Sequence, residues 1–399
     1  MKRLVALLSC ICVLLAVCGT AGALELPYAD RSSIRNPDAV SMLTDLGLLE
    51  GDGGRFFPDG KLTRAEVAKI AALVISSDPQ PAGKAPFSDL GRCWAADYIA
   101  FCYERGFLAG QGDGSFAPNE AITARELVKM LLGAIGYDLT SYAGPGWVAR
   151  LDTLADSLHI YNGYELSRSK PITRDYAALL ILNVLNCSAI AGYEDGEPVP
   201  VVDSLLNPVT VLEARFGVVR YQQVITANEY ADLENPGHPL AADTTKLYGH
   251  YAMDFHSGLD ALGRTVTVYL RDGQPIGVPV YNPEEFCVTV SGRDALDTLF
   301  QSGGYAPAED VRIYDDGALA GLDALYQLSG TDTATLIDYE SDDIIDLILI
   351  WRWQEYEVVQ GSPLVIATGE GNQVFPSLST AADEVSAMQI NGSWVVSPF

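Results

Sequence analysis

The stretch Leu62-Thr63-Arg64-Ala65-Glu66 contains the residues that decide the fold of the first half of the chain. The Thr63 hydroxyl can accept a hydrogen bond from a free backbone N–H of a helix that starts at Arg64, and Glu66 completes a capping box. Apolar residues follow at helical spacing: Val67, Ile70, Ala71 and Val74. Arg64 then lies beside the unpaired N–H groups of the helix N-terminus, where a carboxylate or phosphate group can bind. The alternative is a surface ion pair between Arg64 and a nearby acid.

The same pattern occurs twice more along the chain. Residues 106–118 lead into Ile122-Thr123-Ala124-Arg125-Glu126, and a weaker copy runs from residue 158 through Pro171-Ile172-Thr173-Arg174-Asp175. The three threonines are separated by 60 and 50 residues. A single unit of this size would not bury its own apolar face, so we expect the three copies to fold together as a repeat structure.

These copies resemble the S-layer homology (SLH) domain, because several short motifs occur in the order typical of that family. The first copy contains Tyr28-Ala29-Asp30, Gly47-Leu48-Leu49-Glu50-Gly51, Phe56-Phe57-Pro58 and Thr63-Arg64-Ala65-Glu66. The second contains Phe87-Ser88-Asp89, Trp94, the glycine turn at residues 106–110, Phe116-Ala117-Pro118 and Thr123. The resemblance covers roughly residues 26–189, a little under half of the chain.

The resemblance implies an all-α, pseudo-threefold bundle whose grooves between repeats hold a cell-wall polysaccharide, often one with ketal-linked pyruvate. A pyruvyl carboxylate suits a guanidinium group and helix-end N–H groups, and a sugar ring suits an aromatic surface. The candidate glycan-binding residues are therefore Arg64, Arg174 and Arg125, the acids Asp30 and Asp89 for hydroxyl groups, and Trp94 as platform. For the aromatic residues, core packing is the alternative role.

The second and third copies depart from the family pattern at the arginine. In the second copy Arg125 comes one position later than Arg64 in the first, which rotates it by about 100° around the helix. Arg125 is therefore expected to miss the site that Arg64 reaches. The third copy keeps Thr173 and Arg174 but lacks the glycine-rich lead-in. We expect at most two of the three grooves to bind well.

Acidic residues dominate the charge of the chain. Its 399 residues carry a formal net charge of −27. Such a chain would be repelled by nucleic acid and by anionic lipid, so we exclude both as partners. The length allows two or three domains.

The N-terminal residues 1–23 are typical of an export signal. Lys2-Arg3 precedes an apolar stretch that is too short to span a bilayer, and Ala21-Gly22-Ala23 offers a cleavage site. A lipidated Cys18 is the alternative. No other segment is long and apolar enough for a membrane span, so we expect a secreted protein of the cell wall or surface layer. Cys93 and Cys102 could form a disulfide outside the cell, but buried free thiols are favoured.

The sequence predicts a multidomain protein, α-helical first and β-rich afterwards. The predicted parts are a signal peptide (1–23), three repeats (24–84, 85–141 and 142–190), a linker (191–204), a β-rich module (205–290) and a second β-rich module or its continuation (291–399). Strands are expected at 217–227, 265–270, 276–281, 286–290, 335–337, 347–353 and 356–359, with short helices within 205–216, 295–301 and 322–327. Arg271-Asp272-Gly273-Gln274 is typical of a hairpin turn.

Two groups in the β-rich part offer metal ligands. The acids Asp338, Glu340, Asp342 and Asp346 alternate ahead of a strand, and oxygen ligands at such spacing suit calcium. A solvated acidic turn is the alternative. His250, Asp254 and His256 would share one face of a strand and could bind zinc, against the alternative of an exposed polar strand face.

Two classes of function remain open. The first is a non-enzymatic surface protein that is held on the wall polysaccharide by residues 26–189, without a cofactor, and displays its β-rich region for adhesion or self-association in a surface layer. The second is a wall-anchored polysaccharide hydrolase with its site in residues 205–399. The sequence contains no nucleophile elbow, phosphate-binding glycine loop or paired glycosidase motif, which favours the first class.

Overall fold

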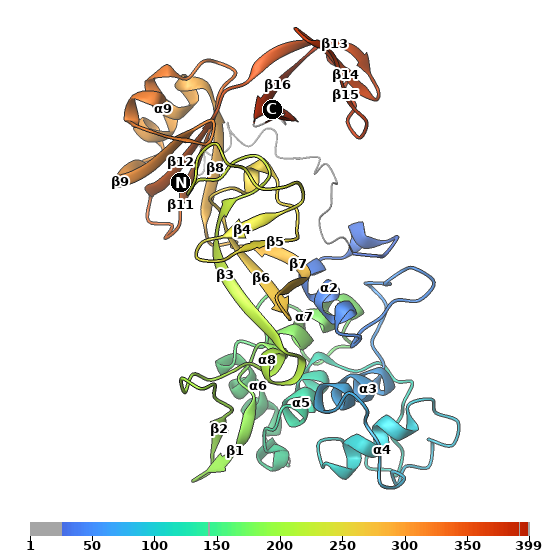
Figure 1. Ribbon diagram of the computed structural model, residues 1–399. Coiled ribbons are helices and arrows are strands. Elements are labelled where there is room, and N and C mark those ends of the chain that lie inside the picture. The colour runs from blue at the N-terminus through green and yellow to red at the C-terminus, as the bar shows by residue number, and fades with distance from the viewer. Residues whose placement is uncertain (1–25, 143, 391, 398–399) are drawn as a thin grey trace. The chain divides into compact units, whose positions relative to one another are not determined.

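The computed structural model describes residues 26–142, 144–390 and 392–397, so the predicted export signal lies outside the described residues. The chain divides into two compact units. We call them the helical unit, which runs to Arg220 and includes Val268–Val278, and the β-rich unit, Tyr221–Thr267 and Pro279–Phe399. The predicted order of an α-helical part followed by a β-rich part is confirmed (Figure 1).

The helical unit contains the three helix starts predicted from the repeated motif. Its helices are η1 (Arg31–Ser33), α2 (Pro37–Asp45), α3 (Arg64–Ile75), α4 (Ala96–Glu104), α5 (Ala124–Ala134), η2 (Leu139–Tyr142), α6 (Trp147–Ser157), α7 (Arg174–Leu185) and α8 (Val211–Phe216). The capping boxes of α3, between Thr63 and Glu66, and of α5, between Thr123 and Glu126, are both formed. Helix α7 has the threonine cap alone, because Tyr176 stands where the other two helices have glutamate.

The three segments that precede these helices join in a closed ring of backbone hydrogen bonds. Leu62 N donates to Ile172 O over 3.3 Å, Ile172 N to Ile122 O over 2.9 Å, and Ile122 N to Leu62 O over 2.9 Å. Each of the three side chains is at most 1% exposed. The three copies therefore meet around a common centre, and none of them could bury these residues alone.

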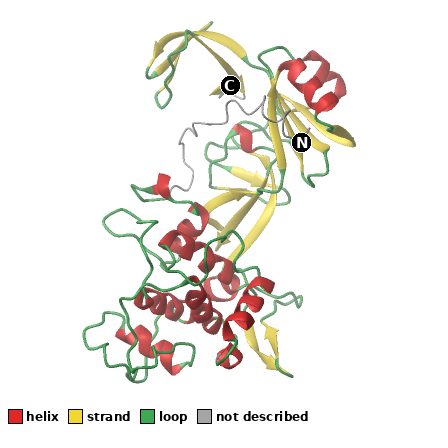
Figure 2. Cartoon of the chain, turned by 180° about the vertical axis from the view of Figure 1, so that it is seen from behind, coloured by secondary structure: helices red, strands yellow, loops and turns green. Residues whose placement is uncertain are grey.

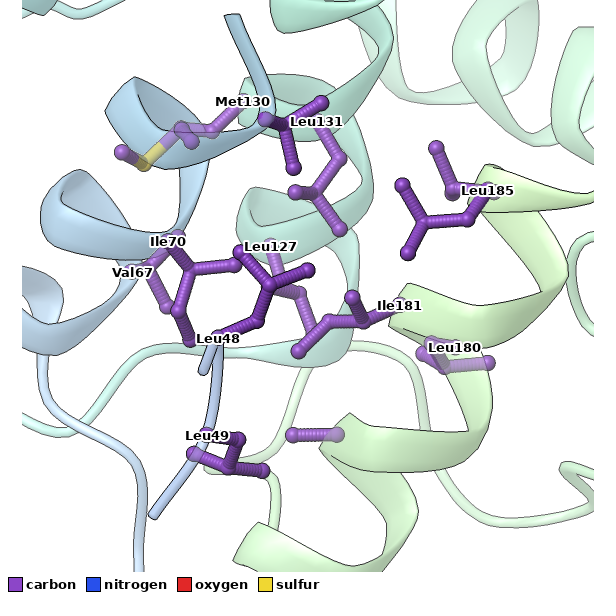
Figure 3. Close-up of a cluster of buried hydrophobic side chains, with 14 of the residues drawn as sticks. Leu48, Leu49, Val67, Ile70, Leu127, Met130, Leu131, Leu180, Ile181 and Leu185 are labelled. Carbon is purple, nitrogen blue, oxygen red and sulfur yellow. The ribbon is translucent and has the colours of Figure 1, made fainter. Parts of the chain in front are cut away.

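Apolar faces of α3, α5 and α7 form the core around that centre (Figure 3). The residues labelled there come from the turn after α2 and from these three helices: Leu48, Leu49, Val67, Ile70, Leu127, Met130, Leu131, Leu180, Ile181 and Leu185. Burial of a large aliphatic side chain contributes roughly 1.5–3 kcal/mol, so this shared cluster is the main stabilising feature of the unit.

The inner part of a hairpin from much later in the sequence, Val268–Val278, also belongs to the helical unit. Strands β6 (Thr265–Arg271) and β7 (Gln274–Tyr281) flank the predicted turn, in which Asp272 and Gly273 have positive φ. Tyr269 of β6 is buried in the helical core, and Gly277 N donates to the Asp45 carboxylate over 2.8 Å.

Strands dominate the rest of the chain (yellow in Figure 2). The remaining strands are β1 (Ile190–Glu194), β2 (Glu197–Pro200), β3 (Val218–Ala227), β4 (Thr245–Leu247), β5 (Ala252–Met253), β8 (Phe286–Ser291), β9 (Ala306–Asp315), β10 (Ala318–Ala320), β11 (Thr333–Asp338), β12 (Ile344–Trp351), β13 (Gln354–Gly361), β14 (Leu364–Thr368), β15 (Gly371–Phe375), β16 (Glu384–Ile390) and β17 (Ser393–Val396). The helices among them are η3 (Leu259–Ala261), α9 (Gly292–Ser302) and η4 (Leu322–Gln327).

Strands β1 and β2 form a two-stranded sheet. The other strands, together with β6 and β7, form three five-stranded sheets, in the orders β5-β4-β3-β6-β7, β10-β9-β12-β11-β8 and β15-β14-β13-β16-β17. In the second sheet β12 is parallel to β9 and antiparallel to β11. Helix α9 packs on this sheet through Leu296, which shares a buried cluster with Leu336 and Ile348. The seven strands expected between residues 217 and 359 are present, whereas the strand considered for His250, Asp254 and His256 is limited to Ala252–Met253.

Some boundaries differ from the sequence prediction. Residues 190–200, expected to begin the linker, form the hairpin β1–β2, because Asp195 and Gly196 adopt the positive φ of a two-residue turn. Residue 291, where the sequence predicts either a second module or a continuation, lies within one sheet, since β8 pairs with β11. The short helix expected within 205–216 covers only Val211–Phe216, as α8. The one expected within 322–327 is the 3-10 helix η4.

Candidate functional site

Arg64 lies between the first and second copies. Its side chain is buried, with Nε donating to Phe116 O over 2.9 Å and Nη2 to Ala109 O over 3.1 Å. The guanidinium carbon lies 4.6 Å from the centre of the Phe116 ring, and Nη1 lies 3.5 Å from the Glu126 carboxylate. Burial lowers the pKa of Arg64, an effect opposed by Glu126. Arg64 thus connects the two copies, and its side chain also borders a hollow beside them.

Arg174 makes the same set of contacts between the third and first copies. Nε donates to Phe56 O over 3.0 Å, Nη2 to Glu50 O over 2.5 Å, and Nη1 to the Glu66 carboxylate over 3.0 Å. The guanidinium lies 5.1 Å from the Phe56 ring centre. Two of the three interfaces are therefore built around an arginine at the first position of a helix.

The third interface lacks these groups. Ala124 is the first residue of α5. Tyr176 and Leu179 of α7 stand where α3 has Glu66 and Lys69 and where α5 has Glu126 and Lys129, three and six residues after the capping threonine.

Arg125 points elsewhere, as the sequence predicts from its rotation around the helix. It forms a bidentate pair with Asp152 of α6, at 3.0 and 2.8 Å. Nearby, Arg168 pairs with Asp156 and lies 3.7 Å from the Tyr161 ring centre. At this interface both arginines are thus paired with acids of the protein itself.

The helix N-termini themselves are not free, which corrects the sequence prediction of ligand-binding N–H groups. Arg64 N donates to Glu120 O, Ala65 N to Pro118 O and Glu66 N to the Thr63 hydroxyl. In α7, Arg174 N and Asp175 N donate to Gly60 O and Pro58 O in the same way. The lead-in loop of the neighbouring copy takes these donors, so an anion would be bound by side chains.

A hollow of about 640 Å³ opens beside Arg64. The turn at residues 105–111, helix α5, residues 137–140 and Trp147 line it together with Arg64. Glu126 and Lys129 of α5 supply one charge of each sign. Lys129 Nζ donates to Tyr142 O over 2.8 Å and lies 4.6 Å from the centre of the Trp147 ring. Burial lowers the pKa of Lys129. Arg64, Lys129, the Glu126 carboxylate and an indole ring therefore meet in one cleft, which Arg105 and Asp138 also line.

Three other predicted site residues are placed differently. Asp30 accepts hydrogen bonds from Phe56 N and Phe57 N over 2.8 and 2.9 Å, and Asp89 accepts them from the backbone at residues 116 and 117 over 2.9 and 2.8 Å. Burial alone would raise the pKa of Asp30, but these N–H groups hold it below its usual value. A contact of either acid with sugar hydroxyls stays a prediction.

Trp94 is 59% exposed, packs edge-on to Tyr98 and is not among the residues that line the hollow.

Sequence reasoning missed Trp147 and Lys129. Lys129 could have been found, since it lies six residues after a capping threonine, as Lys69 does. Trp147 begins α6 within the degenerate third copy, where no family motif fixes the alignment.

The acids proposed for calcium form a tight turn between β11 and β12. Asp338 accepts hydrogen bonds from Glu340 N and Asp343 N, Asp346 from Tyr339 N, and Asp342 from Ile344 N. Within the described ranges, three possible metal ligands come together at a different place, outside this turn. Calcium binding here stays a prediction.

All four cysteines of the described chain are free thiols, including Cys93 and Cys102. Over the same residues, no helix has the length and apolar character needed to cross a membrane.

Comparison with known proteins gives the class of this molecule. The family model of the S-layer homology domain matches residues 27–68 and 86–123, which are the first two copies. A surface-layer 125 kDa protein of Lysinibacillus sphaericus is 27% identical over 55% of this chain and 20% of its own length. A cellulosome-anchoring protein of Acetivibrio thermocellus is 40% identical over 18% of this chain and 17% of its own. An uncharacterized cell wall amidase of Bacillus anthracis is 33% identical over 20% of this chain and 15% of its own length.

The chain thus spans no more than about a fifth of the length of these relatives. The matches define a protein that carries S-layer homology domains. It is an SLH domain-containing surface protein, secreted to the cell surface.

Proposed function

We propose that the helical unit anchors the exported protein non-covalently to the cell wall by binding an acidic, pyruvylated wall polysaccharide. The observation that carries this proposal is the hollow in which Arg64, Lys129 and Trp147 meet. The relative named as a cellulosome-anchoring protein supports an anchoring role for this kind of domain.

The cleft offers a complementary partner for each part of such a sugar. A guanidinium has five N–H donors, and two of those of Arg64 are used by backbone carbonyls, so donors remain for a ligand carboxylate. The Lys129 ammonium, with one bond to Tyr142 O, can donate to the same carboxylate. The Trp147 ring offers a face for the sugar ring, and Glu126 can accept hydroxyl hydrogen bonds. Partial burial strengthens the charge contacts relative to open water.

We extend the proposal to a groove at the Arg174 interface, because the contacts of Arg174 repeat those of Arg64. We propose that residues 142–190 are a third, divergent repeat, since the hydrogen-bond ring includes Ile172 on equal terms with Leu62 and Ile122. Grooves at Arg64 and Arg174 would then bind, whereas the interface at Ala124 would serve the fold alone. Two weak sites on one chain retain a polymer better than one.

We further propose that the β-rich unit is displayed without catalytic activity, for adhesion or for self-association in a surface layer. The rival function, a wall-anchored hydrolase, draws on the relative named as a cell wall amidase. Release of soluble wall fragments by the purified protein would favour the hydrolase.

The anchoring proposal is tested by sedimentation of the protein with purified cell walls that carry or lack pyruvyl groups. We expect wild type to bind pyruvylated walls, and Lys129→Ala and Trp147→Ala to lose about tenfold or more in affinity, because each removes one contact of about 1.4 kcal/mol or more. Lys84→Ala, in an exposed loop, is the matched control and should bind as wild type. Equal binding to both kinds of wall would contradict the carboxylate contact.

A further inference from the structure

We propose a binding site for a divalent transition-metal ion, of which zinc is the best fit, in the β-rich unit at Glu229, Asp243 and His256. One ligand atom from each residue lies within 4.8 Å of the others. His256 Nδ1 is 3.6 Å from Asp243 Oδ1 and 3.9 Å from Glu229 Oε1. The three residues come from different segments: after β3, before β4 and after β5.

The imidazole nitrogen that faces the two carboxylates has no partner of its own. His256 Nδ1 is buried and makes no hydrogen bond, since both carboxylate oxygens lie beyond hydrogen-bond distance. A buried polar atom without a partner costs about 1–3 kcal/mol. The ligand atoms of a tetrahedral zinc ion lie about 3.4 Å apart, given bonds of about 2.1 Å. The observed separations are thus too long for hydrogen bonds and close to those that a metal ion requires.

Hydrogen bonds of the cluster residues and of their neighbours hold the three segments in place. Asp243 N donates to Glu229 Oε2 over 2.8 Å, and Glu229 Oε1 is the oxygen 3.9 Å from His256 Nδ1. The buried Asn228, next to Glu229, donates to Ser257 O and Gly258 O over 3.2 and 2.9 Å. On the other side of His256, the Thr245 hydroxyl donates to Phe255 O over 2.8 Å. Ligands fixed in this way need little rearrangement when an ion binds.

The donor set selects the class of ion. One imidazole and two carboxylates match the mixed nitrogen and oxygen ligands of zinc, whereas calcium prefers six to eight oxygen ligands. The two carboxylates also balance the charge of a divalent ion. The Asp243 side chain is 64% exposed, so water can fill the remaining positions, while His256 and Glu229 are 14% and 18% exposed.

This site differs from the one that the sequence pattern predicts. His250 and Asp254 do not join His256, because only Ala252–Met253 forms a strand there and the predicted alternation ends. The His250 ring instead packs against Tyr221, at 4.6 Å between ring centres. An ion at the observed site would tie together three segments between β3 and β6, a stretch with little regular secondary structure.

The test is calorimetric titration of the chelator-treated exported protein with zinc chloride, together with melting curves. We expect one zinc ion per chain and a higher melting temperature of the β-rich unit. Asp243→Asn and His256→Gln should each weaken zinc binding by at least tenfold, since even indirect partners of a metal contribute about 10- to 100-fold in affinity. Asp243→Asn keeps the size of an exposed side chain, so this variant tests the site without disturbing the core.

The matched control is His250→Gln, which removes an imidazole outside the cluster and should bind zinc as wild type. The proposal is overturned if wild type gives no zinc heat, if His256→Gln and His250→Gln bind zinc equally well, or if calcium binds and zinc does not. Wall binding plays no part in this test, so its result is independent of the anchoring function.

Discussion

At the scale of single residues, Arg64 combines two roles that can be separated. It bridges two copies through Phe116 O and Ala109 O, and it lines the hollow beside them. Arg64→Lys keeps the charge but cannot reach both carbonyls, because an ammonium lacks the planar fork. We expect this change to lower the free energy of unfolding of the helical unit by about 1–3 kcal/mol, through carbonyls left without a partner.

Urea unfolding followed by helical circular dichroism measures this change. The exposed Arg92→Lys is the control and should unfold as wild type. Unchanged stability of Arg64→Lys would show that the bridge is unimportant. Lys129→Ala, by contrast, is expected to weaken wall binding with little effect on unfolding.

The positions of Arg64 and Arg174 were predictable, because a capping threonine marks the start of each helix. Their partners were not, since Phe116 and Phe56 lie 52 and 118 residues away in the sequence and only the folded ring brings them close. For the same reason the sequence could not reveal that the neighbouring copy takes the helix N–H groups, or that His256 meets Glu229 and Asp243.

At the scale of elements, local signals predicted what local chemistry determines. The capping boxes of α3 and α5 and the turn between β6 and β7 were predicted correctly. The assignment of this hairpin to the helical unit depends on contacts of Tyr269 and Gly277 with distant helices, which no local pattern records.

The hairpin's attachment can be tested at Gly277. This residue has φ of +66°, and an added Cβ would lie 3.1 Å from the Met42 methyl group. Gly273, in the turn, has φ of +78° and open space around it. Both alanine variants meet the backbone cost of a positive φ, roughly 1–2 kcal/mol. We therefore expect Gly277→Ala to lower the melting temperature of the helical unit more than Gly273→Ala, and equal shifts would contradict the close packing on α2.

At the scale of the whole molecule, the strong negative charge limits how the chain can hold an acidic polymer. A surface with net charge −27 repels such a ligand at long range, so binding must come from local cationic grooves. The proposed grooves have matching parts: Arg64, Glu126 and Lys129 in one, and Arg174 and Glu66 in the other, with Lys69 at the same helix position as Lys129. Their presence on one chain makes multivalent retention the expected mode of anchoring.

Multivalency predicts how two variants combine. If both grooves engage one wall, Lys69→Ala and Lys129→Ala should each weaken retention moderately, and the double variant should lose the additional factor, 10² or more, that simultaneous binding supplies. Dissociation from immobilised pyruvylated walls measures this, with Lys170→Ala, an exposed lysine of the third copy, as control. If Lys69→Ala has no effect and the double variant behaves as Lys129→Ala alone, the Arg64 groove anchors the protein by itself, and the Arg174 interface serves only to join the copies.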